Sequence, residues 1–366
     1  MNDVSIEKNQ EQISNKSETP RIYKSISDKY IEDKADTKNF KKKPSNTRYE
    51  GRIKNGKKHG LSVVYYENGE IEYEGNLFQD EKSGKGKCFF KDGNVYEGEW
   101  TNNKRNGKGK LIYKNADTYE GDWVMDIKEG FGVYIFAYGD KYEGYWKDGV
   151  RSGQGVYTYN CRTRYEGIWK DGDKNGYGKY FSKVGFLEYE GNWVNGNKQG
   201  EGIYYYDNGD CYKGKWENGF KSIEGCYIFH DGDRYEGQWK LGKKEGFGVY
   251  YCKNKDVYRG QWANDFREGQ GTYAYNDGDF YDGQWKNGVK CGYGKFRFSE
   301  GNVYEGYWKD DKRNGLGVYY YSNLVKCYEG EWCDDMKNGR GIGYDSKGNV
   351  DYEGIWNKNK KKKVRK

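Results

Sequence analysis

One phrase of 23 or 24 residues repeats along more than four-fifths of the chain and constrains the fold more than any other feature. Each copy opens on Tyr-Glu-Gly-x-Trp, crosses a polar stretch and closes on Gly-x-Gly-x-Tyr, as residues 142–157 show. A fixed period of this size is typical of architectures in which each unit packs on its neighbours. The opening tyrosines are Tyr49, Tyr73, Tyr96, Tyr119, Tyr142, Tyr165, Tyr189, Tyr212, Tyr235, Tyr258, Tyr281, Tyr304, Tyr328 and Tyr352.

The tryptophans share one phase of this period. All twelve stand four residues after an opening tyrosine, from Trp100 to Trp356. Only the first two units differ, with Ile53 and Leu77 at that position. Because chance does not place every tryptophan at one phase, the chain is predicted to hold thirteen units and a terminal half-unit.

Aromatic residues and glycines alternate within each unit, which is the period of a β-strand. Alternate residues of a strand point to one face, and two such runs joined by a Gly-bearing turn form a β-hairpin. The predicted structural core of a unit is Tyr142, Gly144, Trp146, Gly153, Gly155 and Tyr157. Glycine inside a strand marks a close approach by another group, and we expect a Trp or Tyr ring of the adjacent strand to lie over it.

The expected fold class is all-β: an elongated, single-layer ribbon of antiparallel hairpins. A lone hairpin is marginal in water, but stacked hairpins bury their aromatic faces against one another. Two strands per unit give about 9.6 Å of length, so thirteen units span about 125 Å. The opposite face, with Glu143, Tyr145 and Gln154, is expected to be mostly polar, and the 24-residue units are expected to add a bulge.

Composition divides the chain into three parts. Residues 1–47 are polar, contain both prolines and are expected to form a disordered extension, with a short helix over 22–31 as the alternative. The repeat array occupies residues 48–356, and a basic disordered tail follows at 357–366.

The excess positive charge is terminal. Of the net charge of +7, the last ten residues supply +7 and the first 47 supply +2, which leaves −2 for residues 48–356. A nearly neutral array argues against a basic lipid-reading groove and against specific nucleic-acid binding. The tail is a candidate contact for an anionic membrane; nuclear import and simple solubilisation are the alternatives. Its cations are Lys358, Lys360, Lys361, Lys362, Lys363, Arg365 and Lys366.

The terminal half-unit is expected to have no second strand. That leaves an open strand edge beside exposed aromatic residues, and natural proteins usually cover or pair such edges. Pairing with the same edge of a second copy gives a symmetric dimer. The candidate dimer edge comprises Tyr328, Trp332, Tyr352, Ile355 and Trp356.

No catalytic, cofactor-binding or metal-binding set is expected. The two histidines, His59 and His230, lie far apart, and the eight cysteines form no C-x-x-C pair. Because no secretory signal or apolar stretch of membrane-spanning length is found, we expect an intracellular protein, at most peripheral to a membrane.

The repeated phrase, as in residues 142–157 and 235–250, resembles the MORN repeat (membrane occupation and recognition nexus) over residues 48–356. The resemblance implies a curved sheet of hairpins with an aromatic-lined groove, and a role as a scaffold or tether. Repeat-only members resemble cytoskeletal scaffolds of apicomplexan and kinetoplastid parasites. Those organise a ring at the base of daughter cells or a collar at the flagellar base, and form antiparallel dimers through their C-terminal repeats.

The sequence therefore predicts a non-enzymatic, rod-like and dimeric scaffold that organises a cytoskeletal or membrane-associated assembly in cell division. Its expected partners are proteins and a second copy of the chain. The alternatives are an adaptor that binds anionic lipids such as phosphoinositides, and a component of an axoneme or radial spoke.

Overall fold

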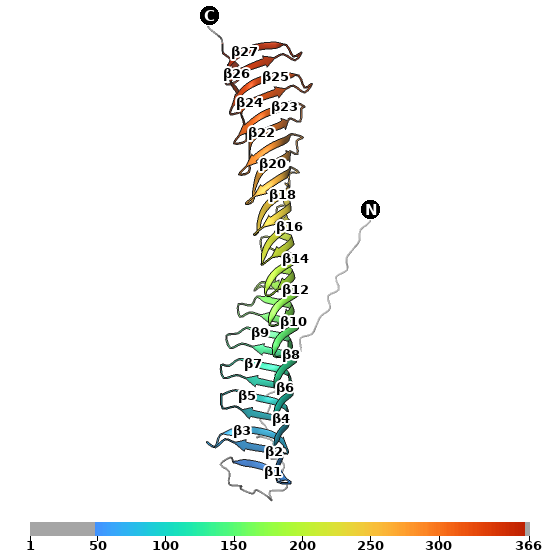
Figure 1. The fold of residues 1–366 in the computed structure, drawn as a ribbon, viewed down its shortest axis with the longest axis vertical. Helices are drawn as coiled ribbons and strands as arrows, with labels where there is room; N and C mark the ends of the chain where they lie inside the picture. The colour runs from blue at the N-terminus through green and yellow to red at the C-terminus, as the bar shows by residue number, and fades with distance from the viewer. Residues whose placement is uncertain (1–47, 363–366) are drawn as a thin grey trace, which may run out of the picture.

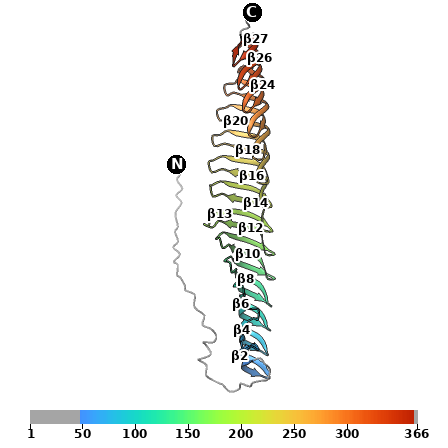
Figure 2. The same cartoon turned by 90° about the vertical axis from the view of Figure 1, so that its left-hand side faces the viewer.

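A computed structural model describes residues 48–362 of the chain. These residues form one antiparallel sheet of 28 strands and contain no helix. The predictions for residues 1–47 and for Lys363, Arg365 and Lys366 fall outside the described residues. Figures 1 and 2 show the sheet as a long narrow ribbon, which confirms the predicted fold class.

The strands follow one another along the ribbon in chain order. The first fourteen are β1 (Tyr49–Lys54), β2 (Lys57–Tyr65), β3 (Ile71–Phe78), β4 (Glu81–Phe89), β5 (Val95–Thr101), β6 (Lys104–Ile112), β7 (Thr118–Val124), β8 (Ile127–Ile135), β9 (Lys141–Lys147), β10 (Val150–Thr158), β11 (Arg164–Lys170), β12 (Asp173–Phe181), β13 (Leu187–Val194) and β14 (Asn197–Tyr205). The others are β15 (Cys211–Glu217), β16 (Phe220–Ile228), β17 (Arg234–Lys240), β18 (Lys243–Tyr251), β19 (Val257–Ala263), β20 (Phe266–Ala274), β21 (Phe280–Lys286), β22 (Val289–Arg297), β23 (Val303–Lys309), β24 (Lys312–Tyr320), β25 (Lys326–Cys333), β26 (Met336–Tyr344), β27 (Val350–Asn357) and β28 (Lys360–Lys361).

Each unit is a hairpin with a two-residue turn. In the unit that opens at Tyr142 the turn residues are Asp148 and Gly149, with φ of 50° and 80°. Positive φ at both positions is the type I′ geometry that matches the twist of the flanking strands. Within the hairpin the register shifts between Arg151 and Gly155, whereas the pairing of β10 with the next unit is unbroken. The resulting bulge bends every second strand.

The 24-residue units place their extra residue in the pairing between units. At β12–β13 the partner of Tyr180 is Tyr189, and the partner of Phe181 is Leu187, so Glu188 is the inserted residue. The three other 24-residue units have register shifts at the same place. The predicted bulges are therefore confirmed. The ribbon also turns gradually along its axis, because strands near β16 are seen edge-on in Figure 1 and broadside in Figure 2.

The opening tyrosine of each unit is the ring that covers its glycines. A Cβ added at Gly155 would lie 2.5 Å from the Tyr142 hydroxyl oxygen, and one added at Gly144 would lie 2.5 Å from the Cα of Gly155. Neither position has room for a side chain. Sequence reasoning left tyrosine and tryptophan open for this role, and the structure assigns it to tyrosine.

The face opposite the aromatic face is called the back face below. Its prediction as mostly polar is wrong in the middle of the array, where Tyr145, Phe131, Ile168 and Tyr177 are exposed to solvent. These residues occupy positions that carry Glu, Lys or Gln in other units. The repeat pattern does not fix them, because nothing in the hairpin packs on that face.

Candidate functional site

The buried face of the ribbon is a continuous stack of aromatic rings. Tyr142 is fully buried between two tryptophans, with ring centroids 5.3 Å from Trp146 of its own unit and 5.2 Å from Trp169 of the next. Both contacts are edge-to-face, at 87° and 79°. Such pairs contribute about 0.5–1.5 kcal/mol each beyond area burial. The stack therefore couples each unit to its neighbour.

The polar atoms of these rings have backbone partners. The Tyr142 hydroxyl donates to the carbonyl oxygen of Tyr145 at 2.9 Å, and the Trp169 indole N–H donates to the carbonyl oxygen of Gly155 at 3.3 Å. The tyrosine bond stays within one unit, whereas the tryptophan bond joins two. Both ring types are thus buried without leaving an unsatisfied polar group.

A row of cations lies on this aromatic face, and sequence reasoning missed it. A lysine or arginine stands nine residues after every opening tyrosine, so the repeat period itself carries the signal. Each one lies over the aromatic rings of the stack. The row is Lys58, Lys82, Arg105, Lys128, Arg151, Lys174, Lys198, Lys221, Lys244, Arg267, Lys290, Arg313, Lys337 and Lys361.

Lys174 illustrates the cage around each cation. Its Nζ lies 5.0–5.4 Å from four ring centroids, which belong to Tyr159, Tyr165, Tyr180 and Trp193. A cation over aromatic faces is attracted by their quadrupoles. Burial works against the charged form and lowers the lysine pKa to about 8 at Lys128, Lys174, Lys198 and Lys221.

The cation row changes the electrostatic interpretation of the array. Arg105 and Arg313 form ion pairs with Asp126 and Asp335 at 3.0 Å. Ten of the fourteen cations, among them the run from Lys174 to Lys290, have no carboxylate within ion-pair distance in the part of the chain that the structure describes. The expectation of a groove without basic character, drawn from the net charge of −2, is therefore wrong. The net charge of the array is a sum over all its residues, so it does not show that the cations of the row lie on one face.

A second row, of aspartates, runs along the same face beside the loops between units. Asp210 accepts hydrogen bonds from the Tyr227 hydroxyl at 2.7 Å and the His230 backbone N–H at 2.8 Å. Burial tends to raise the pKa of Asp210, but these bonds and one from Asn208 outweigh burial and hold it at about 2. Equivalent bonds at Asp117, Asp140, Asp233 and Asp256 tie each loop to the next.

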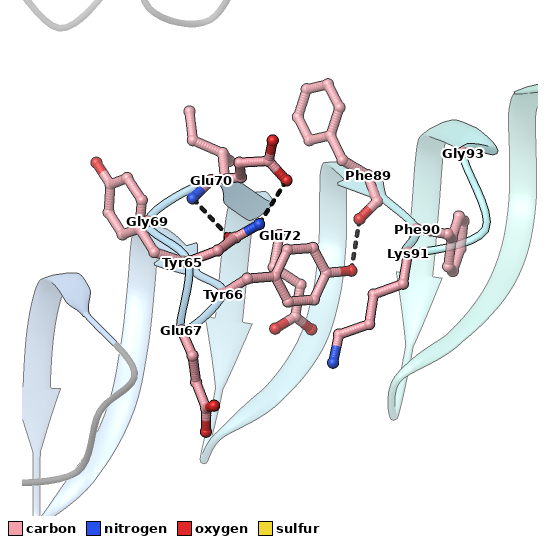
Figure 3. A pocket seen from close by; sticks show the side chains of 12 residues that line it. Tyr65, Tyr66, Glu67, Gly69, Glu70, Glu72, Phe89, Phe90, Lys91 and Gly93 are labelled. Atoms are coloured by element: carbon pink, nitrogen blue, oxygen red, sulfur yellow. Dashed lines mark hydrogen bonds between the residues drawn. The ribbon is translucent and has the colours of Figure 1, made fainter.

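Two hollows lie near the N-terminal end of the ribbon. One of about 340 Å³ has Trp100 and Leu111 among its lining residues, together with Arg105 and Asp126, so it is a segment of the groove between the two rows. The other, of about 1240 Å³, opens between the loops that follow β2 and β4, where Tyr66 donates to the Phe89 carbonyl at 2.6 Å (Figure 3). Within residues 48–362 no group of acidic, His and Cys side chains is arranged to hold a metal ion.

The candidate dimer edge is less open than predicted. The half-unit continues into β28, whose two residues pair with Trp356 and Asn357, so the prediction of no second strand is wrong. Trp356 is buried, as are Tyr328 and Trp332 in the stack. Of the five candidates, Ile355 is exposed and Tyr352 is partly exposed. The outer edge of β27 is unpaired over Tyr352–Gly354 in the described chain.

The basic tail begins in an ordered position. Lys360 and Lys361 form β28, Lys361 pairs with Asp351 and lies over the Tyr352 ring, and the Lys362 N–H donates to Ile355. The prediction of disorder from residue 357 is therefore wrong for residues 357–362. Lys358 occupies the turn and is exposed.

These features define a β-hairpin repeat solenoid with one open sheet, an aromatic stack and a polar groove. The family model described as "MORN repeat" matches thirteen consecutive segments of the chain. The segments are 49–71, 73–95, 96–118, 119–141, 142–160, 165–185, 189–211, 212–234, 235–257, 258–280, 281–303, 304–324 and 328–350. The chain therefore belongs to the MORN-repeat family, whose repeats are not catalytic and mediate interactions with proteins or lipids.

Comparisons with individual proteins add little. No curated protein sequence matches the chain. The TCP10 domain of Danio rerio CPAP, solved with a peptide of STIL, has 11% identity and a TM-score of 0.26 and covers 69% of this chain and 98% of that one. Virginiamycin B lyase from Staphylococcus aureus has 11% identity and a TM-score of 0.13, over 74% of this chain and 76% of that one. Scores this low carry no argument about function. No helix in the described residues is long and apolar enough to cross a membrane.

Proposed function

We propose that the protein is a non-enzymatic scaffold, a rod that holds other molecules at set positions along its length. The observation that carries the proposal is the uninterrupted sheet, in which every unit from Tyr96 onward repeats the same tyrosine, tryptophan and cation contacts. Such a ribbon resists bending and offers many equivalent binding positions. By contrast, an enzyme needs one unit to differ from the rest by a reactive set of side chains.

The groove is the proposed binding face for protein partners. Its cation row and aspartate row run in parallel along the ribbon, so an extended segment with both charges finds partners at a spacing of about 9.6 Å. We place the scaffold at a cytoskeletal or membrane-associated assembly in dividing cells. An axonemal location is the alternative, and imaging of the tagged protein through the cell cycle separates the two.

Proximity labelling from each end tests the scaffold proposal. A labelling enzyme is fused to the N-terminus in one cell line and to the C-terminus in another. A rod about 130 Å long places the two ends beside different neighbours, so we expect two overlapping but distinct sets of labelled proteins. Identical sets from both fusions contradict the proposal.

Binding of anionic lipid is the second candidate function, and the caged cations favour it. The test is sedimentation with vesicles that contain phosphatidylserine or a phosphoinositide. One variant lacks residues 358–366, and the other carries Lys174→Gln, Lys198→Gln and Lys221→Gln. Loss of binding in the groove variant supports lipid recognition by the array, and loss only in the truncated variant assigns it to the tail. Absence of binding by the wild type rejects this function.

Pairing through the C-terminal repeats is part of the scaffold proposal. The unpaired outer edge of β27 at Tyr352–Gly354 offers backbone groups to the same edge of a second copy. Two rods joined there lie end to end, so small-angle scattering of an edge-paired dimer gives about twice the length of one copy.

A further inference from the structure

The aspartate row of the groove is interrupted in two consecutive units near the middle of the array. In five units, the tyrosine that ends the Gly-x-Gly-x-Tyr run donates its hydroxyl to the aspartate of its own unit. In the two exceptional units Thr163 and Phe186 occupy the aspartate position. The hydroxyls of Tyr180 and Tyr204 therefore have no such acceptor, and within residues 48–362 neither of them is buried without a partner. Both are free to donate to a ligand in the groove.

The hairpin turns supply no carboxylate to the lysines of these two units either. Beside Lys244 the second turn residue is Asp265, which accepts the Lys244 backbone N–H at 2.9 Å. The equivalent residues beside Lys174 and Lys198 are glycines. The glutamates that follow the opening tyrosines lie on the back face, because successive residues of a strand alternate between faces. Glu188 acts on the charge of Lys198 only from beyond ion-pair distance, in the part of the chain that the structure describes.

More positive charge surrounds this part of the groove, which is called the carboxylate gap and extends from Arg151 to Lys198. Burial and the nearby charge of Arg151 together lower the pKa of Lys174, and no carboxylate opposes them. The loops before β11 and after β12 add Arg162 and Lys183, which are exposed. Cations grouped in this way attract an anionic ligand.

The rim of the carboxylate gap is also apolar. Val184 is 82% exposed and Phe186 is 42% exposed, both in the loop that follows β12. Lys174 and Lys198 are only partly exposed among their rings, so a narrow segment reaches them more readily than a flat bilayer surface does. The expected ligand is therefore a segment that combines acidic and apolar side chains.

The spacing of the cations indicates the conformation of that segment. Successive cations are about 9.6 Å apart along the ribbon. A polyproline II segment has three residues per turn, so every third side chain points the same way after a rise of about 9.3 Å. In a β-strand, by contrast, side chains three residues apart point to opposite faces. The backbone carbonyls of a polyproline II segment have no internal hydrogen bonds and can accept from tyrosine hydroxyls.

We propose that the carboxylate gap binds a proline-rich polyproline II segment of a partner protein, with an acidic residue at every third position. The acidic side chains contact Lys174 and Lys198, and Arg151 receives a third. The prolines pack against Phe186 and the neighbouring rings, as such segments do in other aromatic-lined grooves. The inference rests on the proposed role of the groove as a binding face for proteins, and it adds the kind of segment and its position.

Fluorescence anisotropy of a labelled peptide with the full chain tests the proposal. The probe contains three Pro-Pro-Glu repeats, and the control peptide has the same composition with its glutamates adjacent. We expect a dissociation constant below about 1 mM for the probe, and binding of the control that is at least fivefold weaker. Equal affinities contradict the argument from spacing, and a probe that does not bind at about 1 mM overturns the proposal.

The double variant Thr163→Asp, Phe186→Asp closes the carboxylate gap. Both substitutions install the residue that six other units have at this position, so they suit the loops. The added carboxylates accept from Tyr180 and Tyr204 and neutralise the cations, and we expect the affinity for the probe to fall at least tenfold. Asn302→Asp, at the same repeat position outside the gap, is the matched control and leaves the affinity unchanged. A double variant that binds as tightly as the wild type overturns the proposal.

Vesicles that contain phosphatidylserine distinguish a lipid from a protein segment as the source of negative charge. If the vesicles bind the wild type but not the double variant, and the probe binds neither, the gap recognises lipid and the proposal is wrong. If the probe fails to bind while the two end fusions still label distinct sets of proteins, the scaffold function stands and only this site is rejected.

Discussion

Replacing Gly178 by alanine tests the ring-over-glycine packing that holds the ribbon together. A Cβ at this position would lie 2.5 Å from Cε2 and 2.6 Å from Cζ of Tyr165. The Tyr165 ring is fully buried, 5.4 Å from the centroid of Trp169 and 5.3 Å from that of Trp193, so it has no direction in which to retreat. The backbone of Gly178 does not have a positive φ, so alanine itself fits the conformation.

The magnitude follows from the two ways in which the chain can respond. Expelling the ring exposes about 200 Å², or about 5 kcal/mol at 25 cal/mol per Å², and loses two edge-to-face contacts. Retaining it forces the strands apart, and overpacking costs about 1–3 kcal/mol or more. The chain follows the less costly response, and because two tryptophans hold the ring we expect a loss of about 3 kcal/mol.

Hydrogen exchange by mass spectrometry measures this loss locally, which matters because a long repeat array does not unfold in one step. A loss of about 3 kcal/mol corresponds to exchange roughly a hundred times faster in peptides from β11–β14. Peptides from β3–β6 of the same molecule are the reference and stay unchanged, because each unit contacts only its neighbours.

Gly172→Ala is the matched control. Gly172 has φ +87° and no atom within 4 Å of an added Cβ, so alanine there costs only the left-handed conformation, about 1–2 kcal/mol. A second control places Gly178→Ala in a Tyr165→Leu background, where the added methyl has room. Equal losses from Gly178→Ala and Gly172→Ala refute the packing argument, as does an undiminished effect in the leucine background.

Three further predictions concern single positions and pH. Ile223 has φ +62°, at a position where most other units have glycine. Ile223→Gly is therefore expected to stabilise its hairpin by about 1 kcal/mol, measured as slower hydrogen exchange, and an unchanged exchange rate contradicts this. Trp193→Phe removes the hydrogen bond of 3.3 Å from the indole N–H to the Gly178 carbonyl. It lowers the local free energy of opening by about 1 kcal/mol or more in hydrogen exchange of peptides from β12–β14, and an unchanged exchange rate contradicts this. Four caged lysines have their pKa lowered by burial to about 8, below the ordinary 10.5, so the unfolded chain binds more protons between these values and stability rises with pH from 8 towards 10. The variant in which methionine replaces all four lysines, Lys128, Lys174, Lys198 and Lys221, shows a smaller rise in stability between pH 8 and 10 than the wild type. An equal rise in both proteins contradicts the lowered lysine pKa values.

Much of the fold followed from the sequence because each contact recurs at the same phase. The alternation around Tyr142 and Trp146 gave the strands and their buried face, and the 24-residue spacings gave the bulges. The end of the array was less predictable. Residues 360 and 361 lack the Gly-x-Gly pattern, yet they pair with β27 because its edge offers free backbone groups.

The candidate site was predicted only in part. The aromatic lining of the groove was expected, but the row from Lys58 to Lys361 was not, although its nine-residue offset from the opening tyrosine is as regular as that of the tryptophans. The net charge of the array did not indicate this cation row, because the aspartates and glutamates that balance its charge lie in other rows.

The sequence by itself determined the repeat, the all-β ribbon and the family. Each unit carries the same residues at the same positions of the period, so each forms the same local structure. Only the tertiary structure decided which ring covers the glycines and which cations gather in aromatic cages. Those features depend on which residues of different units come to share a face, and that is fixed by strand register and by bulges rather than by order along the chain.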